Sequence, residues 1–304
     1  MLSRRAAAVG IILIAAFLTL VSARSHAETF TLRIGAGHPS APIAYVNQME
    51  HFFVPEVIRR VETRTAHSVR FIQAYAGTAA KINETLEAVE KGLLDIGGWC
   101  PCFDPSKAFP LNISYFLPFT TPDVRVQVRV IRELLDEFPE LHDYLETKYN
   151  QKLLAVSGLD NYGLCTTFPW EKISDLKGRK LLGAGPNLPW ISGVDAIPLS
   201  SSLITAYNQM ATGAAYGFLS LPGSYYGFRL YEQAPHLKVT NFGAMAQVVL
   251  TMNLETRARL PADVVAIVDQ VAAEWETVAT RVSYEKERSS LEKLRSAGAI
   301  ITEI

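Results

Sequence analysis

The stretch ISDLKGRKLLGAGPNLPWISGVDAIPLSS, residues 173–201, decides how this chain is expected to fold. Its apolar run at 180–182 breaks at the glycine-rich string 183–187, and a new helix can begin at Asn187 with Pro189 in its first turn. Strands that end in a glycine-rich turn before a helix form ligand pockets in open α/β folds, because backbone N–H groups are left pointing outward. We therefore expect the ligand at this turn.

The N-terminus has the features of an export signal. Arg4 and Arg5 precede an apolar run at 6–21, and Ser25-His26-Ala27 is a small-x-small cleavage site. The run is shorter than the roughly 20 residues that a membrane span needs. We expect a signal peptide over 1–27, cleaved near Ala27, and a periplasmic mature protein. An uncleaved anchor and a twin-arginine route are the alternatives.

The net charge of the chain argues against a nucleic-acid partner. It is -1 at neutral pH, with 29 basic and 30 acidic residues, whereas a protein that neutralises phosphates needs a basic surface. The rest of the chain has no apolar run long enough to cross a bilayer, which predicts a soluble mature protein.

Three cysteines leave the disulfide pattern open. The odd number in Cys100, Cys102 and Cys165 means at least one free thiol in a monomer. A Cys100–Cys102 bridge would close a very small ring, and a bridge from Cys165 would link distant segments. Three small buried residues are the third interpretation. No histidine stands at ligand spacing from the first pair, so we expect no zinc or other metal.

The first half of the mature chain alternates between strand and helix patterns. Such an alternation predicts a parallel sheet with right-handed crossovers, and pockets in these sheets lie at the carboxyl ends of the strands. Gly37, Tyr75 and Trp99 stand at three such ends. The expected elements are a strand at 29–34, a helix at 44–65, a strand at 69–75, a helix at 79–91 and a strand at 93–99.

The second half predicts another lobe, joined to the first by strands. Glycine and asparagine break the chain at 158–163, which is the first candidate crossing, and the strand at 248–253 is the second. A long charged helix follows at 261–297. We expect an α/β protein with lobe I at 28–157, a return of 254–304 to that lobe, and lobe II at 158–253.

Sequence signatures of catalysis are missing. There is no G-x-S-x-G elbow, H-E-x-x-H motif or phosphate loop. The string Gly35-Ala36-Gly37 lacks the third glycine of a dinucleotide fingerprint, since Ser40 stands in that place. Glu84, Glu87 and Glu90 are more typical of a solvated helix face than of an acid/base pair. This profile favours binding over catalysis and predicts no cofactor.

Two long strings carry a resemblance to a known family. The first is GTAAKINETLEAVEKGLLDIGGW with FPLNISYFLPF, and the second is ISDLKGRKLLGAG with SLITAYNQMATGAAYGFLSL. Together they resemble the extracytoplasmic solute receptors of tripartite ATP-independent periplasmic (TRAP) transporters, over residues 29–301. The resemblance implies a periplasmic-binding-protein-like clamshell of mixed, mostly parallel sheets, joined by hinge strands and a long helix.

The same resemblance implies a function without covalent chemistry. A small ligand would be captured by hinge closure and delivered to the membrane permease subunits of the transporter. A receptor that senses a ligand for a membrane signalling partner is the alternative, and an exported enzyme on this scaffold is a third interpretation.

The chain departs from the family at the positions that clamp carboxylates. The family's arginine after the DLKG motif falls at Leu182, and a second arginine falls at Tyr162. The string 213–219 lacks the acidic residues of its family counterpart. Because a buried carboxylate without a partner costs several kcal/mol, we expect a ligand other than a simple dicarboxylate. On this interpretation, Leu182→Arg would gain dicarboxylate affinity.

Aromatic and amide side chains are the candidates that remain for the ligand site. The aromatic set suits an apolar ligand, or a cation held over ring faces with Glu84 or Asp160 nearby, although about half could simply fill the core. N–H groups around Gly185 could still hold a monocarboxylate. The candidate residues are Glu84, Trp99, Phe103, Asn161, Tyr162, Leu182, Gly185, Asn187, Trp190, Asn208, Phe218 and Tyr225.

Overall fold

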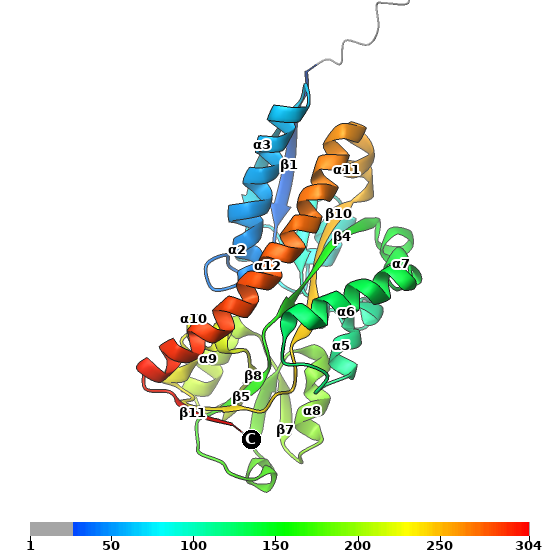
Figure 1. The fold of residues 1–304 in the computed structure, drawn as a ribbon. Helices are drawn as coiled ribbons and strands as arrows, with labels where there is room; N and C mark the ends of the chain where they lie inside the picture. The colour runs from blue at the N-terminus through cyan, green and yellow to red at the C-terminus, as the bar shows by residue number, and fades with distance from the viewer. Residues whose placement is uncertain (1–26, 304) are drawn as a thin grey trace, which may run out of the picture.

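The computed structural model describes residues 27–303, which form two lobes, each built on one β-sheet (Figure 1). The predicted α/β class and the two-lobed arrangement are confirmed. The predicted signal segment up to residue 26 lies outside the described residues. Among residues 27–303, no helix combines the length and the apolar character that crossing a bilayer would take.

The sheet of the first lobe has the strand order β2-β1-β3-β10-β4. As the sequence predicts, β1 (Thr29–Gly35) is parallel to both β2 (Ser68–Ala74) and β3 (Ile96–Trp99). β10 (Met245–Asn253) is antiparallel to β3 and to β4 (Gln151–Leu159). The sheet is therefore mixed, with its parallel part at the N-terminal side.

The sheet of the second lobe has the order β11-β9-β5-β8-β6-β7. Its strand β6 contains the apolar run of the opening stretch and is parallel to β7 and β8, whereas β5 is antiparallel to β8 and β9. The strands are β5 (Gly163–Thr166), β6 (Lys180–Gly183), β7 (Ile197–Ser200), β8 (Gly217–Ser220), β9 (His236–Val239) and β11 (Ile300–Glu303).

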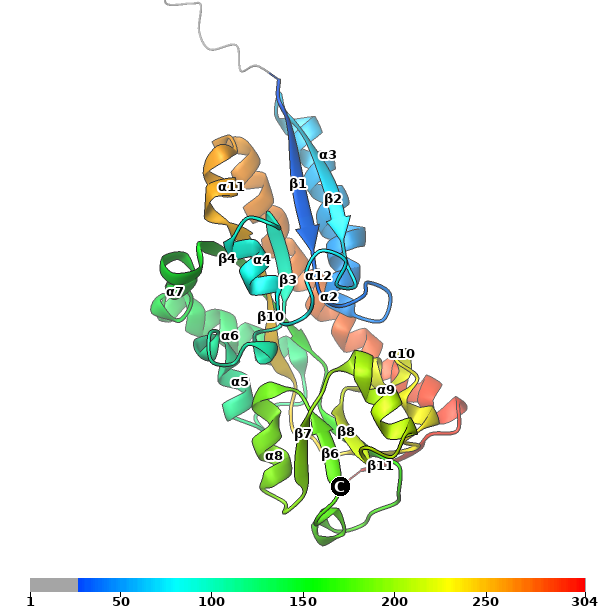
Figure 2. The same ribbon diagram turned by 180° about the vertical axis from the view of Figure 1, so that it is seen from behind.

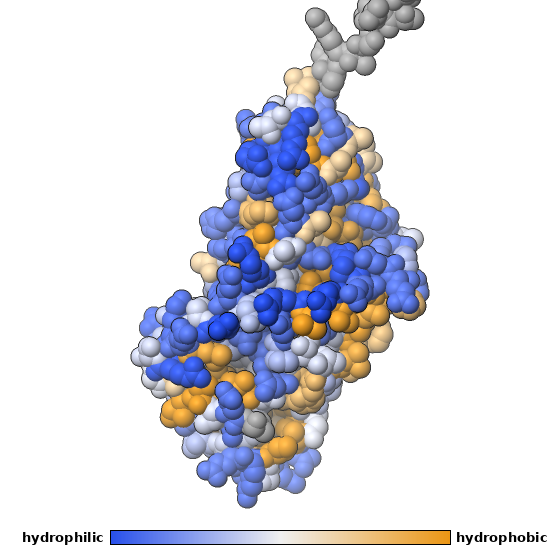
Figure 3. Space-filling model, viewed as in Figure 1, coloured by the Kyte–Doolittle hydropathy of each residue, from blue (hydrophilic) through white to orange (hydrophobic). Residues whose placement is uncertain are grey.

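Helices cover both sheets, and Figure 2 shows α8 and α9 on the second lobe from behind. They are α2 (Ala44–Gln48), α3 (Val54–Arg64), α4 (Thr85–Glu90), α5 (Ile113–Phe116), α6 (Val124–Glu137), α7 (Glu140–Tyr149), α8 (Leu188–Ser192), α9 (Leu203–Ala211), α10 (Pro222–Gly227), α11 (Leu254–Arg259) and α12 (Ala262–Ser296). On the face seen in Figure 3, hydrophilic residues cover most of α12 and α6, while hydrophobic residues gather near α5.

The predicted helix at 44–65 is confirmed, with a wider turn inside it. Between α2 and α3, a π-helical turn spans Met49–Phe53, and the Val54 N–H donates to the Met49 carbonyl five residues back. Pro55 follows directly, and proline has no N–H to continue the α-helical pattern. The wider turn absorbs this interruption, so the apolar face still points at the sheet.

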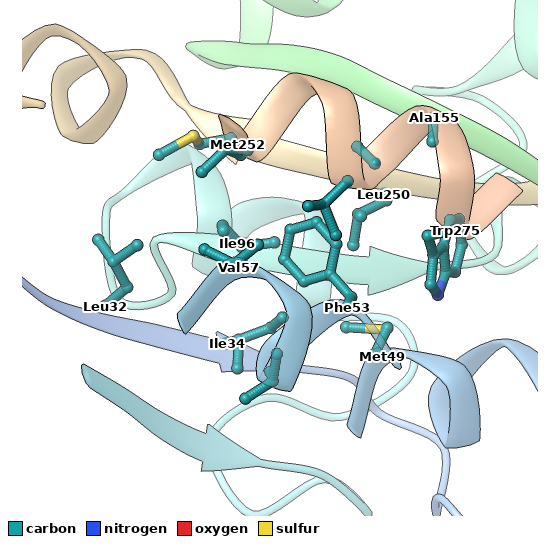
Figure 4. Packing of buried hydrophobic residues seen from close by; sticks show 14 of the residues in the cluster. Leu32, Ile34, Met49, Phe53, Val57, Ile96, Ala155, Leu250, Met252 and Trp275 are labelled. Carbon is teal, nitrogen blue, oxygen red and sulfur yellow. The ribbon is translucent and has the colours of Figure 1, made fainter. Parts of the chain in front are cut away.

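One long helix connects the two lobes. α12 packs against α2, α3, β4 and α6 of the first lobe and against α10 of the second (Figure 1). Trp275 on this helix is fully buried, and Figure 4 shows it beside Phe53, Met49 and Leu250 in the core of the first lobe. The predicted helix at 261–297 is confirmed.

The structure differs from the predicted lobe boundaries at two strands. The sequence places the second crossing at 248–253, but all of β10 lies in the first sheet and the chain crosses at 240–244. Its apolar core, Val248 to Leu250, is buried between β3 and β4. β11 pairs with β9 in the second lobe, although 254–304 is predicted to return to the first.

Two helices are shorter than their sequence patterns predict. α4 begins only at Thr85, since Glu84 accepts the Lys81 N–H and closes a turn before it. The aromatic-rich segment 223–232, whose sequence predicts one helix, divides into α10 and a 3₁₀ turn at Leu230–Glu232, and Arg229 in the left-handed region separates them. A local hydrogen bond and a left-handed residue set the ends of these helices, and the spacing of apolar residues predicts neither of them.

The cysteines adopt the smallest of the bridges considered. Cys100 and Cys102 form a disulfide across Pro101. Cys165 is a buried free thiol, and burial raises its pKa to about 12. The thiol is therefore protonated at neutral pH and behaves as a small core residue.

Candidate functional site

Two crossing segments join the lobes and are bonded to each other. The chain passes from β4 to β5 through residues 160–162, and from β9 to β10 through residues 240–244. The Tyr162 N–H donates to the Gly243 carbonyl at 3.1 Å, and the Phe242 N–H donates to the Tyr162 carbonyl at 3.3 Å. The Asn161 side chain accepts the Gly243 N–H and donates to Asn241. These bonds make the two crossings a single structural unit.

A cavity lies between the lobes beside this unit. Its volume is about 40 Å³, which is room for a few water molecules. The first lobe contributes His38, Ile43, Tyr45, Cys100, Cys102, Phe103 and Leu159. The second contributes Tyr162, Ala184, Leu203, Phe218, Leu219, Ser220, Leu221 and Ser224. Its walls therefore come in similar numbers from both lobes.

The described lining residues include no arginine, lysine, aspartate or glutamate. Burial lowers the pKa of His38 to about 4, so its imidazole is neutral at neutral pH. Burial also raises the pKa of Tyr45 above its ordinary value, which keeps that hydroxyl protonated. The Tyr162 hydroxyl lies 2.9 Å from the Tyr115 hydroxyl behind the wall. The described wall thus carries polar groups but no charge.

His38 reaches the cavity because of the backbone that follows β1. A Cβ added at Gly37 would collide with the backbone of Ile82, so glycine is needed for this close approach. The His38 carbonyl accepts the Ala76 N–H at 3.0 Å, which fixes the loop against the end of β2. Gly37 is predicted to stand at this edge of the sheet, whereas His38 is not among the predicted residues. The signal that could have found it is its place just beyond the carboxyl end of a parallel strand.

The glycine-rich turn after β6 is a contact between the lobes. Gly185 has a φ of +56°, and a Cβ there would collide with the Cys102 carbonyl oxygen of the first lobe. Asn187 accepts the Ala184 N–H at 2.8 Å through Oδ1, which uses one of the N–H groups expected to face a ligand. Of this turn, Ala184 lines the cavity. The turn is placed at the cleft as predicted, although its backbone faces the opposite lobe.

Three of the twelve predicted site residues line the cavity, and two flank it. Phe103, Tyr162 and Phe218 form part of its wall. Gly185 and Asn187 follow the lining residue Ala184. The structure therefore brings together aromatic residues from both lobes, as the sequence analysis expects for the ligand site.

Three predicted residues fill the core instead of lining this cavity. Trp99 is buried in the first lobe, where its Nε1 donates to Thr251 Oγ1 at 2.9 Å. Leu182 is fully buried in the core of the second lobe, opposite Phe218 in the strand register. Tyr225 is equally buried, and its hydroxyl donates to the Ala234 carbonyl. Each side chain has packing or hydrogen-bond partners that leave it turned away from the cavity.

The remaining predicted residues lie at other places. Glu84 and Asn208 are exposed on the surface. Asn161 belongs to the crossing unit described above. Trp190 lines a separate apolar cavity of about 250 Å³, which second-lobe residues form together with Phe119 of the first lobe, and its ring is stacked on Phe242.

A cluster of titratable side chains lies at the hinge, where the crossing unit meets α12 beside the cavity. Asp160 accepts the Gly223 N–H at 2.9 Å, and Glu287 of α12 accepts the Asn161 N–H at 3.3 Å. Burial raises the pKa of both carboxyl groups. Lys286 lies beside Asp160 and donates to the Pro42 carbonyl of the first lobe. This cluster joins α12, the crossing and the loop before α2.

Comparison with protein families matches residues 44–304 to the bacterial extracellular solute-binding proteins, family 7. The chain belongs to that family. No curated protein matches this family 7 protein. Among the residues that the structure describes, no group of three histidine, cysteine, aspartate or glutamate side chains is placed to hold a metal ion.

Solved structures confirm the clamshell fold of this family 7 protein. A Bordetella pertussis extracytoplasmic solute receptor that binds pyroglutamic acid is 18% identical, with a TM-score of 0.78 over 90% of this chain and 87% of that one. A TRAP solute-binding protein from Sulfitobacter sp. NAS-14.1, with bound α-D-taluronate, is 21% identical, with a TM-score of 0.76 over 91% and 88%. One from Pseudomonas putida F1, with D-glucuronate, is 17% identical, with a TM-score of 0.76 over 90% and 88%.

Proposed function

We propose that this chain is the periplasmic solute receptor of a TRAP transporter. It captures a small organic molecule between its lobes and delivers it to the membrane permease subunits, without chemical change to the ligand. Its export depends on a signal peptide cleaved near Ala27. Membership of family 7 and the likeness to TRAP receptors support this proposal.

The observation that carries the proposal is the cavity whose walls come from both lobes. A ligand that contacts both lobes binds the closed form better than the open one, so it shifts the population toward closure. The crossing unit of residues 160–162 and 240–244 is where the backbone can bend. The contact of Gly185 with Cys102 then marks how close the lobes come.

A thermal-shift screen of the mature chain, followed by small-angle scattering, tests this function. A ligand at 100 times its dissociation constant adds about 2.7 kcal/mol to the free energy of unfolding. We expect at least one small organic molecule to raise the melting temperature and reduce the radius of gyration, with no turnover. A melting temperature unmoved across a broad screen, or conversion of the bound compound, would contradict the proposal.

A transport assay separates delivery from sensing. Reconstitution with the permease subunits should give uptake of the same compound that closes the receptor. Closure without uptake would favour a receptor for a membrane signalling partner.

A further inference from the structure

The wall of the cavity between the lobes contains one buried polar atom without a partner. His38 is only 6% exposed, and its Nε2 has no hydrogen-bond partner among the described residues. The ring is held in place by edge contacts with Tyr45 and Phe103, at centroid distances of 6.1 and 5.6 Å. A buried polar atom left unpaired costs about 1–3 kcal/mol. A ligand that pairs with Nε2 would recover this free energy.

The partner of the other ring nitrogen decides what Nε2 can offer. His38 Nδ1 lies 3.1 Å from the Tyr45 hydroxyl, which is itself buried. That hydroxyl has a proton to donate, and Nδ1 is its one hydrogen-bond partner among the described residues. Among the described residues, only Nδ1 is placed to accept this proton, and a neutral imidazole that accepts at Nδ1 carries its own proton on Nε2. Nε2 is therefore a hydrogen-bond donor, and its partner on the ligand must be an acceptor such as an oxygen atom.

The surroundings disfavour a charged ligand. The described wall residues bring no cation, and the neutral His38 supplies none. An ion moved into such a site loses several kcal/mol of hydration without an opposite charge to compensate. The nearest charged groups belong to the hinge cluster, in which Lys286 lies beside Asp160, and Glu287, whose pKa is raised to about 8, is mostly uncharged at neutral pH. None of these side chains lines the cavity. A carboxylate therefore has no favourable electrostatic partner in this wall.

We propose that this cavity selects a compact, uncharged organic molecule, and that His38 Nε2–H donates to a carbonyl-type oxygen of that molecule. This inference rests on the proposed receptor function and names its ligand class. Apolar side chains such as Phe103, Phe218 and Leu221 enclose the body of the ligand, while His38 and Tyr45 fix its orientation. Lactams, amides and small ketones have this combination of an apolar body and one strong acceptor.

Matched ligand pairs test the inference on the mature chain by calorimetry. Each pair is a carboxylate and its carboxamide, with pyroglutamate and pyroglutamamide as the first pair and 2-pyrrolidinone as the compound without either group. We expect the uncharged members to bind at least tenfold more tightly than their carboxylates. His38→Ala should weaken that binding by at least tenfold, whereas His51→Ala, which changes an exposed histidine, should leave it unchanged.

Tyr45→Phe gives a second variant that keeps the size of the side chain. It removes the hydroxyl that holds the Nε2–H form, so binding of the uncharged compounds should fall by about threefold to tenfold. Circular dichroism and melting temperature confirm that each variant folds. Should His38→Ala fail to fold, Tyr45→Phe carries the test alone.

Tighter binding of the carboxylates than of the amides would overturn the inference, as would unchanged binding by folded variants of both His38 and Tyr45. The receptor function would then stand, because a ligand still closes the lobes. Absence of binding by every member of the pairs and of the broad screen would contradict the receptor function, and the inference falls with it.

Discussion

The cavity and the hinge lie side by side and differ in their buried polar groups, which are neutral in the cavity wall and titratable at the hinge. Along one crossing, Leu159 and Tyr162 line the cavity, while Asp160 and Asn161 bond within the hinge. The described cavity wall has no ionised group, whereas the hinge combines two carboxyl groups with Lys286. The difference is that titratable groups connect the lobes at the hinge, whereas neutral groups line the cavity between them.

Leu182→Arg should have the largest effect, because it puts a charge behind the cavity wall. Leu182 is fully buried in the core of the second lobe, so the guanidinium would have neither water nor a carboxylate partner. We expect a loss of about 3–5 kcal/mol in the free energy of unfolding, measured by urea denaturation. The volume-conserving Leu182→Met should cost less than about 1.5 kcal/mol.

This expectation reverses the one that the family resemblance gives for the same variant. A stable Leu182→Arg protein with new dicarboxylate affinity would show that residue 182 can reach the ligand. It would then be wrong to separate this core position from the residues that line the cavity.

Gly185→Ala tests whether the lobes must approach as closely as the structure shows. The added Cβ would collide with the Cys102 carbonyl, so closure and ligand affinity should fall by at least tenfold. Gly178→Ala is the matched control, because Gly178 has a φ of +70° but open space around it. Both variants carry the cost of a left-handed alanine, about 1–2 kcal/mol. Calorimetry with a screened ligand should therefore separate them, and equal affinities would mean that this contact is not needed for binding.

Glu287→Gln should change how stability depends on pH. Burial, followed by the charge of Asp160, raises the pKa of Glu287 from 4.5 to about 8, and Asp123 faces the same group. The folded state then binds more protons than the unfolded state, so the free energy of unfolding falls as pH rises from about 4.5 to about 8. The slope is at most about 1.4 kcal/mol per pH unit for each proton.

Urea denaturation across this pH range checks the prediction for Glu287. The glutamine variant should lose most of the slope between about pH 6.5 and 8. Below pH 6.5, the raised pKa of Asp160 and the lowered pKa of His38 contribute slopes of opposite sign. Exposed Glu285→Gln is the control on the same helix. A wild-type protein whose stability rises with pH between about pH 6.5 and 8 would contradict the buried-carboxyl account of the hinge.

Trp190→Phe should have the smallest effect, because Trp190 lines the other cavity. The variant loses the hydrogen bond from Nε1 to the Tyr115 carbonyl, which is worth about 0.5–1.5 kcal/mol of stability. Ligand affinity should stay within about twofold of the wild type. A tenfold loss of affinity, with the fold intact, would place the ligand in the apolar cavity that Trp190 lines.

Much of the fold could be predicted from the sequence, because its elements depend on patterns that are local in the chain. The strand at 29–34 and the long helix at 261–297 have clear periodicity, and the glycines at 158–163 mark a real crossing. β9 has only four residues and a weak pattern, so it is missed. β10 is misplaced because an apolar strand can be buried in either sheet, and only the pairing partners decide which.

The site was less predictable, since lining a cavity and filling a core need the same residue types. Trp99 and Phe103 stand four residues apart, yet the first is bonded inside the sheet and the second faces the cleft. Asn161 and Tyr162 are adjacent, yet the first bonds within the crossing unit and the second lines the cavity. His38 carries the unpaired atom, but its place just beyond the end of β1 does not distinguish it from other loop residues until the lobes enclose it.

The most direct test of the neutral-wall account is nuclear magnetic resonance of ¹⁵N-labelled histidine in the mature protein, with His38 assigned by the loss of its signals in His38→Gln. We predict that His38 is neutral at pH 7, with its proton on Nε2, and that it titrates at about pH 4. An imidazole protonated on Nδ1, or one that titrates near the ordinary value of 6.5, would contradict the account.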